Sequence, residues 1–161
     1  MLLAARVRMF VVLLVAAAVS NCGSNPGGPG SILAFTVTAS PNPIAGVLCT
    51  GCGAGSTDRE AATTLTIRET GGAAGTVTLI TLTLRNTATG AVLAQGEINA
   101  AAIAASGSTR VPASGTLDVR VGVHYPGSEQ GPAGTLTCVV RVIDDSGTAV
   151  TQQIVVPVSA L

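Results

Sequence analysis

From Ser31 onward, apolar and polar side chains alternate one by one in short segments separated by clusters of Gly, Pro, Asn and Asp. Successive side chains of a β-strand point to opposite faces, so a period of two predicts strands with one buried face. The clearest segment is Thr116 to Tyr125, where every second residue from Leu117 to Val123 is Leu or Val. This pattern restricts the chain to a fold built from half-buried strands.

Several other segments share this alternation, and we expect about seven or eight strands in all. An adjacent apolar pair, Leu79-Ile80, changes the phase of one segment and predicts a β-bulge there. The stretch from Glu97 to Ala105 fits either a helical stripe or an irregular strand edge, so we leave it open. In the last segment the residues expected to face the core are Val150, Gln152, Ile154 and Val156. The further segments are Leu33 to Thr38, Thr63 to Glu69, Thr76 to Asn86, Ala91 to Gln95, Leu136 to Ile143 and Thr148 to Val158.

The composition agrees with an all-β domain. Hydrophobic residues make up 47% of the chain but aromatics only 2%, so the apolar content is mostly Ala, Val, Leu and Ile, and 20 Gly divide the chain into short pieces. No crossover helices are apparent, which excludes a parallel sheet. The sequence therefore predicts one antiparallel β-sandwich over residues 31–161.

The N-terminus has the pattern of an export signal. Met1 to Arg8 carries two positive charges and no acid, and Met9 to Val19 is an unbroken apolar run. A spanning helix needs about 20 apolar residues, so this run is too short to cross a bilayer and predicts a signal peptide over residues 1–21.

Two ways of processing are compatible with the residues that follow. Val19-Ser20-Asn21-Cys22 resembles the bacterial lipobox, in which the Cys is lipidated and becomes the new N-terminus, although Asn21 departs from the small residue that this pattern prefers. Alternatively, Ala18-Val19-Ser20 resembles an ordinary cleavage site that releases a chain beginning at Asn21. We prefer lipidation at Cys22. Residues 22–30, rich in Gly and Pro, are expected to be a disordered linker that holds the domain away from the membrane.

The charge excludes one class of partner. All eight basic residues are Arg, and without Arg6 and Arg8 of the signal peptide six remain against eight acids, a formal net charge of −2. Nucleic-acid-binding domains carry clustered basic residues, so we expect no nucleic-acid partner.

Cys49-Thr50-Gly51-Cys52 is the motif in this sequence that most suggests a chemical activity. A C-x-x-C pair acts as a redox dithiol when a helix N-terminus lowers the pKa of one thiol, but no helix is predicted after this pair. We prefer a structural disulfide between Cys49 and Cys52 in an oxidising compartment, with redox activity and metal binding as alternatives. Cys138 is expected to face the core as a free thiol, while a bond from it to Cys49 or Cys52 remains the competing pairing.

The remaining titratable residues give no assembled site. His124 is the sole histidine and is predicted on the outer face of a strand, where a surface role is expected. Asp144 and Asp145 offer carboxylates to Ca²⁺, but in a hairpin they are expected to favour the turn. Glu69 and Glu97 are isolated acids with no partner for glycoside hydrolysis. We therefore predict no catalytic residue, no metal and no cofactor.

The segment from Ile32 to Val158 resembles bacterial immunoglobulin-like and fibronectin-type-III-like domains of surface lipoproteins. The resemblance lies in the strand spacing and in three segments. They are Pro41-Asn42-Pro43, which ends the first strand, the corner at Glu69 to Gly72 and the hairpin at Asp144 to Gly147. It implies an immunoglobulin-like sandwich in the cell envelope, lipid-anchored or else periplasmic or secreted. The implied function is non-enzymatic adhesion, scaffolding or accessory binding to an unknown protein or polysaccharide. The alternative is a periplasmic thiol-disulfide oxidoreductase using Cys49 and Cys52.

Overall fold

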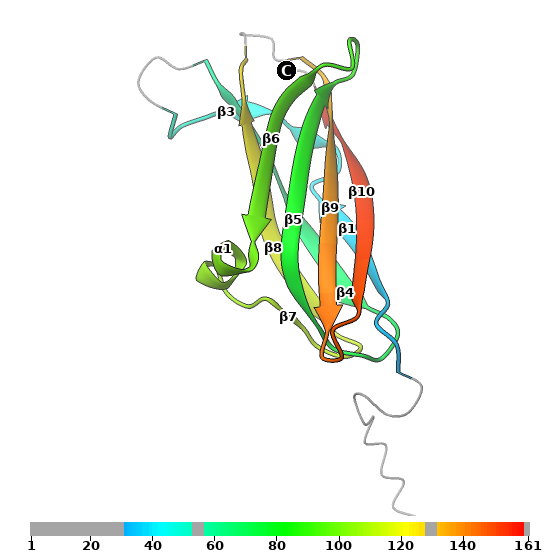
Figure 1. The fold of residues 1–161 in the computed structure, drawn as a ribbon. Coiled ribbons are helices and arrows are strands. Elements are labelled where there is room, and N and C mark those ends of the chain that lie inside the picture. The colour runs from blue at the N-terminus through cyan, green and yellow to red at the C-terminus, as the bar shows by residue number, and fades with distance from the viewer. Residues whose placement is uncertain (1–30, 53–56, 128–131, 160–161) are drawn as a thin grey trace, which may run out of the picture.

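The computed structural model describes residues 31–52, 57–127 and 132–159 of the 161-residue chain. They form an all-β fold with one short helix, as the alternating pattern predicts (Figure 1). None of the described helical residues belongs to a helix long and apolar enough to cross a membrane. In chain order the elements are β1 (Phe35–Ser40), β2 (Ile44–Ala45), β3 (Val47–Leu48), β4 (Arg59–Glu69), β5 (Gly75–Asn86), β6 (Val92–Asn99), α1 (Ala100–Ala105), β7 (Arg110–Val111), β8 (Thr116–Tyr125), β9 (Gly134–Asp144) and β10 (Ala149–Ser159).

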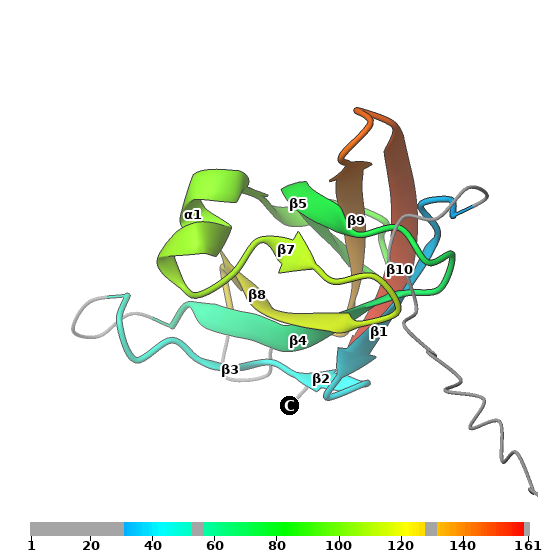
Figure 2. The ribbon, with the colours of Figure 1, turned by 90° about the horizontal axis from the view of Figure 1, so that it is seen from below.

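The strands form two sheets that lie against each other (Figure 2). In the first sheet β4 is central, with β8 along one edge and β1 and β3 along the other. The second sheet has the order β2-β10-β9-β5-β6, and β7 pairs with the start of β5. Among the strands that the structure describes, every pair is antiparallel except β2 with β10. This agrees with the predicted antiparallel architecture.

The segment between β1 and β4 passes from one sheet to the other and back. β1 pairs with β4, Ile44 of β2 then pairs with Val158 of β10, and Val47 of β3 returns to pair with Glu60 of β4. This path brings Cys49, the residue directly after β3, to the edge of the first sheet.

The core lies between the sheets and includes most of the residues that the alternation assigned to inner faces, together with Ile44, Ile103 and Val111, which it did not assign. In β8 the burial pattern alternates strictly from Thr116 to Tyr125, the same limits that the sequence predicts. The fully buried side chains from the other long strands include Leu65, Ile67, Ile80, Leu82, Leu84, Leu136, Cys138, Val140 and Val142.

The phase change in β5 is present, but slightly earlier than predicted. The pairing of β5 with β9 shifts register between Val77 and Leu79, and Thr78 is left out of it. Because one extra residue separates them, Val77 and Ile80 both face the core although they are three positions apart.

The stretch from Glu97 to Ala105 contains both structures that the sequence left open. Glu97 to Asn99 complete β6, and helix α1 follows at once. The Asn99 side chain caps the helix, accepting a hydrogen bond from the Ala102 backbone N–H at 3.0 Å. Ile103 is 1% exposed and anchors the helix on the core.

The prediction that Gln152 faces the core is wrong, because its side chain is exposed. Its neighbours Val150 and Ile154 are only half-buried, whereas Val156 and Val158 are buried. β10 lies near the edge of its sheet, and β2 pairs only with its last two residues. The inward-facing side chains in the first half of β10 therefore lie outside the region that the opposing sheet covers.

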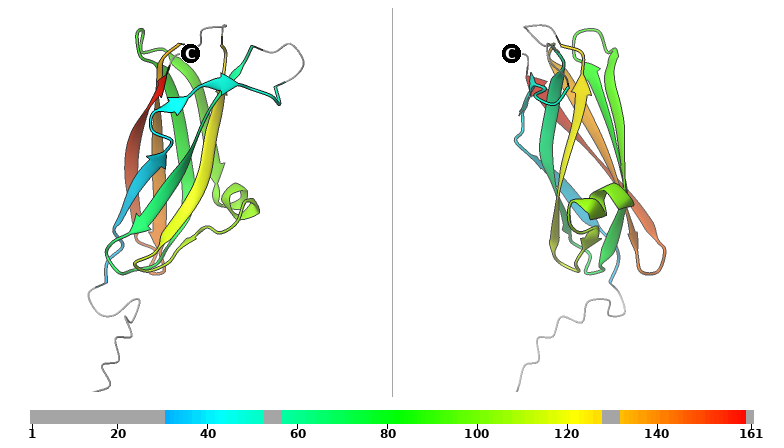
Figure 3. Two further views of the ribbon diagram at one scale, coloured as in Figure 1. Left: turned by 180° about the vertical axis from the view of Figure 1, so that it is seen from behind. Right: turned by 90° about the vertical axis from the view of Figure 1, so that its left-hand side faces the viewer.

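The two ends of the sandwich carry different loops (Figure 3). Ser31, the first described residue, lies at the end formed by the β4–β5, β7–β8 and β9–β10 connections. β3, the last residues of β8 and the end of β10 lie at the opposite end. We call these the Ser31 end and the Cys49 end.

Candidate functional site

The C-x-x-C pair lies in the hairpin connection between β3 and β4 at the Cys49 end. The Cys49 backbone N–H donates to the Asp58 carbonyl at 2.8 Å, which extends the pairing of Leu48 with Arg59 by one step. Cys49 and Cys52 form a disulfide with an S–S distance of 2.08 Å and a Cα–Cα distance of 5.6 Å. The local bond that the sequence analysis preferred is therefore present.

His124 lies directly beside this disulfide. Its Nδ1 atom is 3.6 Å from Sγ of Cys52, and the two sulfur atoms and an imidazole nitrogen all lie within 4.8 Å of one another. The sequence correctly predicted that His124 is exposed on the outer face of β8, but gave no sign of this contact. The contact arises because β3 pairs with the start of β4, and Glu60 of β4 pairs with His124 of β8.

Buried polar residues hold this end of the sheet in place. The Arg59 guanidinium, 3% exposed, donates from Nη1 to the Gly46 carbonyl at 3.0 Å and so ties β4 to the segment between β2 and β3. Tyr125 pairs with Arg59 across β4 and β8 and is buried. Burial raises the pKa of the Tyr125 hydroxyl above its usual value, and the charge of Arg59 opposes that rise. The end of the first sheet next to the disulfide is therefore closely packed.

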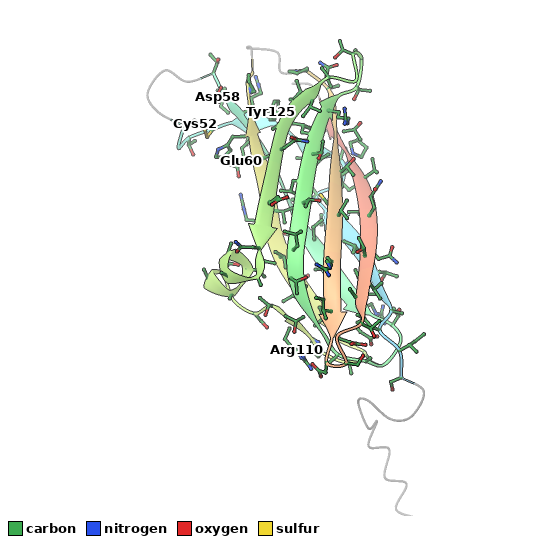
Figure 4. All side chains as sticks on the ribbon, viewed as in Figure 1. Cys52, Asp58, Glu60, Arg110 and Tyr125 are labelled. Carbon is green, nitrogen blue, oxygen red and sulfur yellow. A yellow bond between two sulfur atoms is a disulfide. The ribbon has the colours of Figure 1, made fainter. Side chains whose placement is uncertain are left out.

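Glu60 of β4 pairs with His124 of β8, and both side chains lie on the outer face of the first sheet. Figure 4 labels Glu60 near Cys52 and Asp58. The Glu60 carboxylate lies 3.7 Å from Nη2 of Arg120. An ion pair between Glu60 and Arg120 therefore lies on the same sheet face as His124.

This arrangement supports two kinds of sulfur chemistry. Cys49 is buried and Cys52 is partly exposed, so an incoming reactant reaches Cys52 first. A protonated imidazole beside a sulfur stabilises its thiolate, as a helix N-terminus does in C-x-x-C enzymes. In the described part of the chain α1 is the one helix, and it belongs to another region. Thiolates and an imidazole are also a ligand set for thiophilic metals.

Cys138 takes no part in this cluster. It is the free cysteine of the described residues and is fully buried in β9, as predicted, and the competing bond to Cys49 or Cys52 is not formed. Burial raises the pKa of its thiol to about 12. A thiol so hard to ionise is an inert core residue.

Asp144 and Asp145 lie in the β9–β10 turn at the Ser31 end. Oδ1 of Asp144 accepts hydrogen bonds from the backbone N–H groups of Ser146 at 2.9 Å and Thr148 at 2.8 Å. The carboxylate of Asp145 pairs with both terminal nitrogens of Arg110, labelled in Figure 4. The first acid therefore stabilises the turn, and the second joins it to β7.

Glu69 has a structural role that the sequence analysis missed. Its carboxylate is 1% exposed and accepts hydrogen bonds from the backbone N–H groups of Gly71, Gly72 and Ser114, at 2.6, 2.8 and 2.8 Å. Burial alone would raise its pKa, but these backbone hydrogen bonds outweigh it and the pKa lies below the usual value. Glu97 is exposed on β6 in the other sheet, so the two acids are not paired.

An open depression at the Ser31 end is lined by Ala73, Arg110, Pro112 and Asp145, among others. Arg110 and Asp145 are engaged with each other, so their charges offset one another inside it. The Cys49 end therefore holds the stronger candidate site. The predicted signal peptide, the linker and the lipidation residue Cys22 lie outside the described residues.

Comparisons with known proteins show only the fold. No protein-family model matches the sequence, and no curated protein is similar to it. A Northeast Structural Genomics Consortium target solved by X-ray crystallography is similar in structure, with a TM-score of 0.54 and 10% identity over 79% of this chain and 86% of that chain. A Bordetella pertussis protein provisionally named ApaA has a TM-score of 0.53 and 16% identity over 80% of this chain and 96% of that chain.

Proposed function

We propose that this protein is an exported, lipid-anchored module with an immunoglobulin-like sandwich that acts by binding. The strand connectivity supports the fold. One sheet has the order β1-β4-β8 and the other β10-β9-β5-β6, which corresponds to strands A-B-E against G-F-C with one added edge strand. The short β2 lies on the edge of β10 and pairs with it in parallel.

One observation carries the functional part of the proposal: the domain begins at one end and holds the Cys49–Cys52 disulfide with His124 at the other, next to two exposed apolar residues. Ser31, which follows the predicted linker of residues 22–30, lies at the Ser31 end. Val47 and Leu48, next to the disulfide, are 50% and 57% exposed. A protein anchored at Cys22 would therefore hold the Cys49 end away from the membrane and toward partners in the cell envelope.

Aromatic residues are scarce in the chain, and this guides the choice of partner. The sequence has no Trp, one Tyr and two Phe, and Tyr125 is buried in the core. Sugar-binding surfaces stack their ligands on exposed aromatic rings. A protein partner is therefore favoured over a polysaccharide.

The anchor is tested by replacing Cys22 with Ala and separating membrane and soluble fractions. Two or more acyl chains at about 0.8 kcal/mol per buried methylene give stable attachment, so the wild type should leave the membrane only with detergent. The Cys22→Ala variant should appear in the soluble fraction, while a Ser24→Ala control should behave as the wild type. Membrane retention of the Cys22→Ala variant would exclude lipid anchoring.

The contact between Cys52 and His124 favours a second candidate function, thiol-disulfide exchange. In this mechanism the reduced protein uses the more exposed Cys52 thiolate to attack a substrate disulfide, and His124 stabilises that thiolate. The Cys49 thiol then resolves the mixed disulfide, giving the oxidised protein and a substrate with two thiols. The electron pair passes from the protein dithiol to the substrate.

An insulin-reduction assay separates the two functions. If the protein acts only by binding, the wild type should show no more turnover than a Cys52→Ser variant. Turnover that requires Cys52 and falls in His124→Ala, but not in Cys138→Ala, would overturn the non-catalytic proposal.

A further inference from the structure

The sulfur atoms of Cys49 and Cys52 and the imidazole of His124 come from two separate parts of the chain and meet at one exposed edge. All three ligand atoms lie within 4.8 Å of one another. Cys52 belongs to the β3–β4 hairpin and His124 to β8. From this geometry we propose that the reduced protein binds one thiophilic metal ion, with Zn²⁺ as the test ion, through these three side chains.

The distances fit a single tetrahedral ion. Zn–S bonds of about 2.3 Å and Zn–N bonds of about 2.0–2.1 Å place a sulfur and a nitrogen ligand about 3.5–3.6 Å apart. Sγ of Cys52 and Nδ1 of His124 are already 3.6 Å apart in the oxidised protein. Only the two sulfur atoms have to separate, and the C-x-x-C spacing is the usual one for two ligands of one zinc ion.

The surroundings allow the ion to enter and the loop to adjust. His124 is exposed and Cys52 is partly exposed, so the ion reaches the site without opening the core. Gly51, between the two cysteines, has open space where a side chain would be, so the loop has room to move. Two thiolates neutralise the charge of Zn²⁺, and the fourth coordination position is left for water or a partner's ligand.

The oxidation state of the pair controls binding. In the disulfide the sulfur atoms are bonded to each other and have no thiolate to offer. A dithiol reductant transfers two electrons and two protons, giving two cysteine thiols and its own disulfide. Zn²⁺ then displaces the two thiol protons as it binds. The site is therefore open to metal only after reduction, a property that the binding function proposed above does not require.

The test uses the full exported chain carrying Cys22→Ala, so that Cys22 contributes no thiol. Oxidised protein and protein reduced anaerobically with a phosphine are titrated with Co²⁺ as a spectroscopic probe and then with Zn²⁺. We expect one Co²⁺ per reduced chain with a thiolate-to-cobalt charge-transfer band, displacement of Co²⁺ by Zn²⁺, and no band in the oxidised chain. His124→Ala should weaken binding at least about tenfold, and Cys52→Ser should abolish the band.

Two control variants isolate the site. Thr50→Ala changes the loop without removing a ligand, and Cys138→Ala removes the buried thiol, so both should bind as the parent does. The comparison of oxidised and reduced parent protein needs no variant to fold. Failure of the reduced chain to bind metal, equal binding by the oxidised chain, or unchanged affinity in His124→Ala would each overturn the three-ligand site. None of these results depends on anchoring at Cys22 or on insulin reduction.

Discussion

His124 and Cys52 are 72 positions apart in the chain, yet the imidazole Nδ1 lies 3.6 Å from the Cys52 sulfur. Two pairings produce this contact. The register of β4 with β8 sets Glu60 opposite His124, and the β3–β4 hairpin returns Cys49 to the edge of β4. A site of this kind is a product of strand register, so substitutions that disturb the register should also separate its residues.

The Cys49–Cys52 bond should contribute to stability at the low end of the range for disulfides. It spans a sequence separation of only 3, and closing so short a loop is worth about 2 kcal/mol in the chain-entropy model. We expect a Cys49→Ser/Cys52→Ser double variant to stay folded, with its free energy of unfolding lowered by roughly that amount. Urea denaturation followed by circular dichroism measures the difference. An unfolded double variant would show that the disulfide is essential to the fold.

Replacing Glu69 should destabilise the Ser31 end. Glu69→Ala leaves the N–H groups of Gly71, Gly72 and Ser114 without their acceptor, a loss of at least about 3 kcal/mol at the usual cost of about 1–3 kcal/mol for each unsatisfied group. Glu69→Gln keeps one acceptor oxygen and should lose less. Glu97→Ala, on an exposed strand position, should stay within about 0.5 kcal/mol of the wild type. Equal effects of Glu69→Ala and Glu97→Ala in urea denaturation would contradict this role.

The lowered pKa of Glu69 also predicts a specific loss of stability in acid. The unfolded chain takes up the proton at higher pH than the folded chain does, so the stabilisation is present above the usual pKa of 4.5. It is lost as the pH falls through 4.5 and then through the lower pKa of the folded state. The urea midpoint of the wild type should therefore fall more steeply over this range than that of Glu69→Gln. Parallel curves for the two proteins would exclude Glu69 as the source.

Gly46 and Tyr125 should show energetic coupling. A Cβ at position 46 would overlap the Tyr125 hydroxyl oxygen, whereas the next ring atom, Cζ, would be at 3.4 Å, an ordinary contact. Gly46→Ala should therefore cost about 1–3 kcal/mol. In a Tyr125→Phe background, which removes the hydroxyl, the same change should cost clearly less. A double-mutant cycle by urea denaturation measures this coupling, and strict additivity would argue against the overlap.

Cys138 should resist thiol reagents in the native protein. With its pKa raised to about 12 and its side chain fully buried, it has almost no accessible thiolate near neutral pH. In the Cys22→Ala chain with its disulfide intact, we expect no alkylation by iodoacetamide until denaturant is added, and then one modified thiol. Mass spectrometry provides the count. Rapid alkylation under native conditions would indicate an open core around β9.

The long strands were predictable from the sequence because their signal is local, whereas the two-residue strands β2, β3 and β7 were not predicted. A side chain's face in a strand depends only on its position, so the alternation in Thr116 to Tyr125 was enough to give β8 its limits and its buried residues. The same reasoning was wrong for Gln152, because a pattern of two faces does not reveal where the opposing sheet ends. It also left Glu97 to Ala105 undecided, since a helix as short as α1 has too few residues to display a period.

By itself, the sequence determined that this chain is all-β, which face of most long strands is buried, and that Cys138 faces inward while His124 faces outward. The tertiary structure decided which strands are neighbours. Only this arrangement of strands buries Glu69 against two loops and places His124 beside Cys52. The physical reason is that the two-residue period follows from the backbone within each strand, whereas register and sheet order depend on packing between residues far apart in the chain.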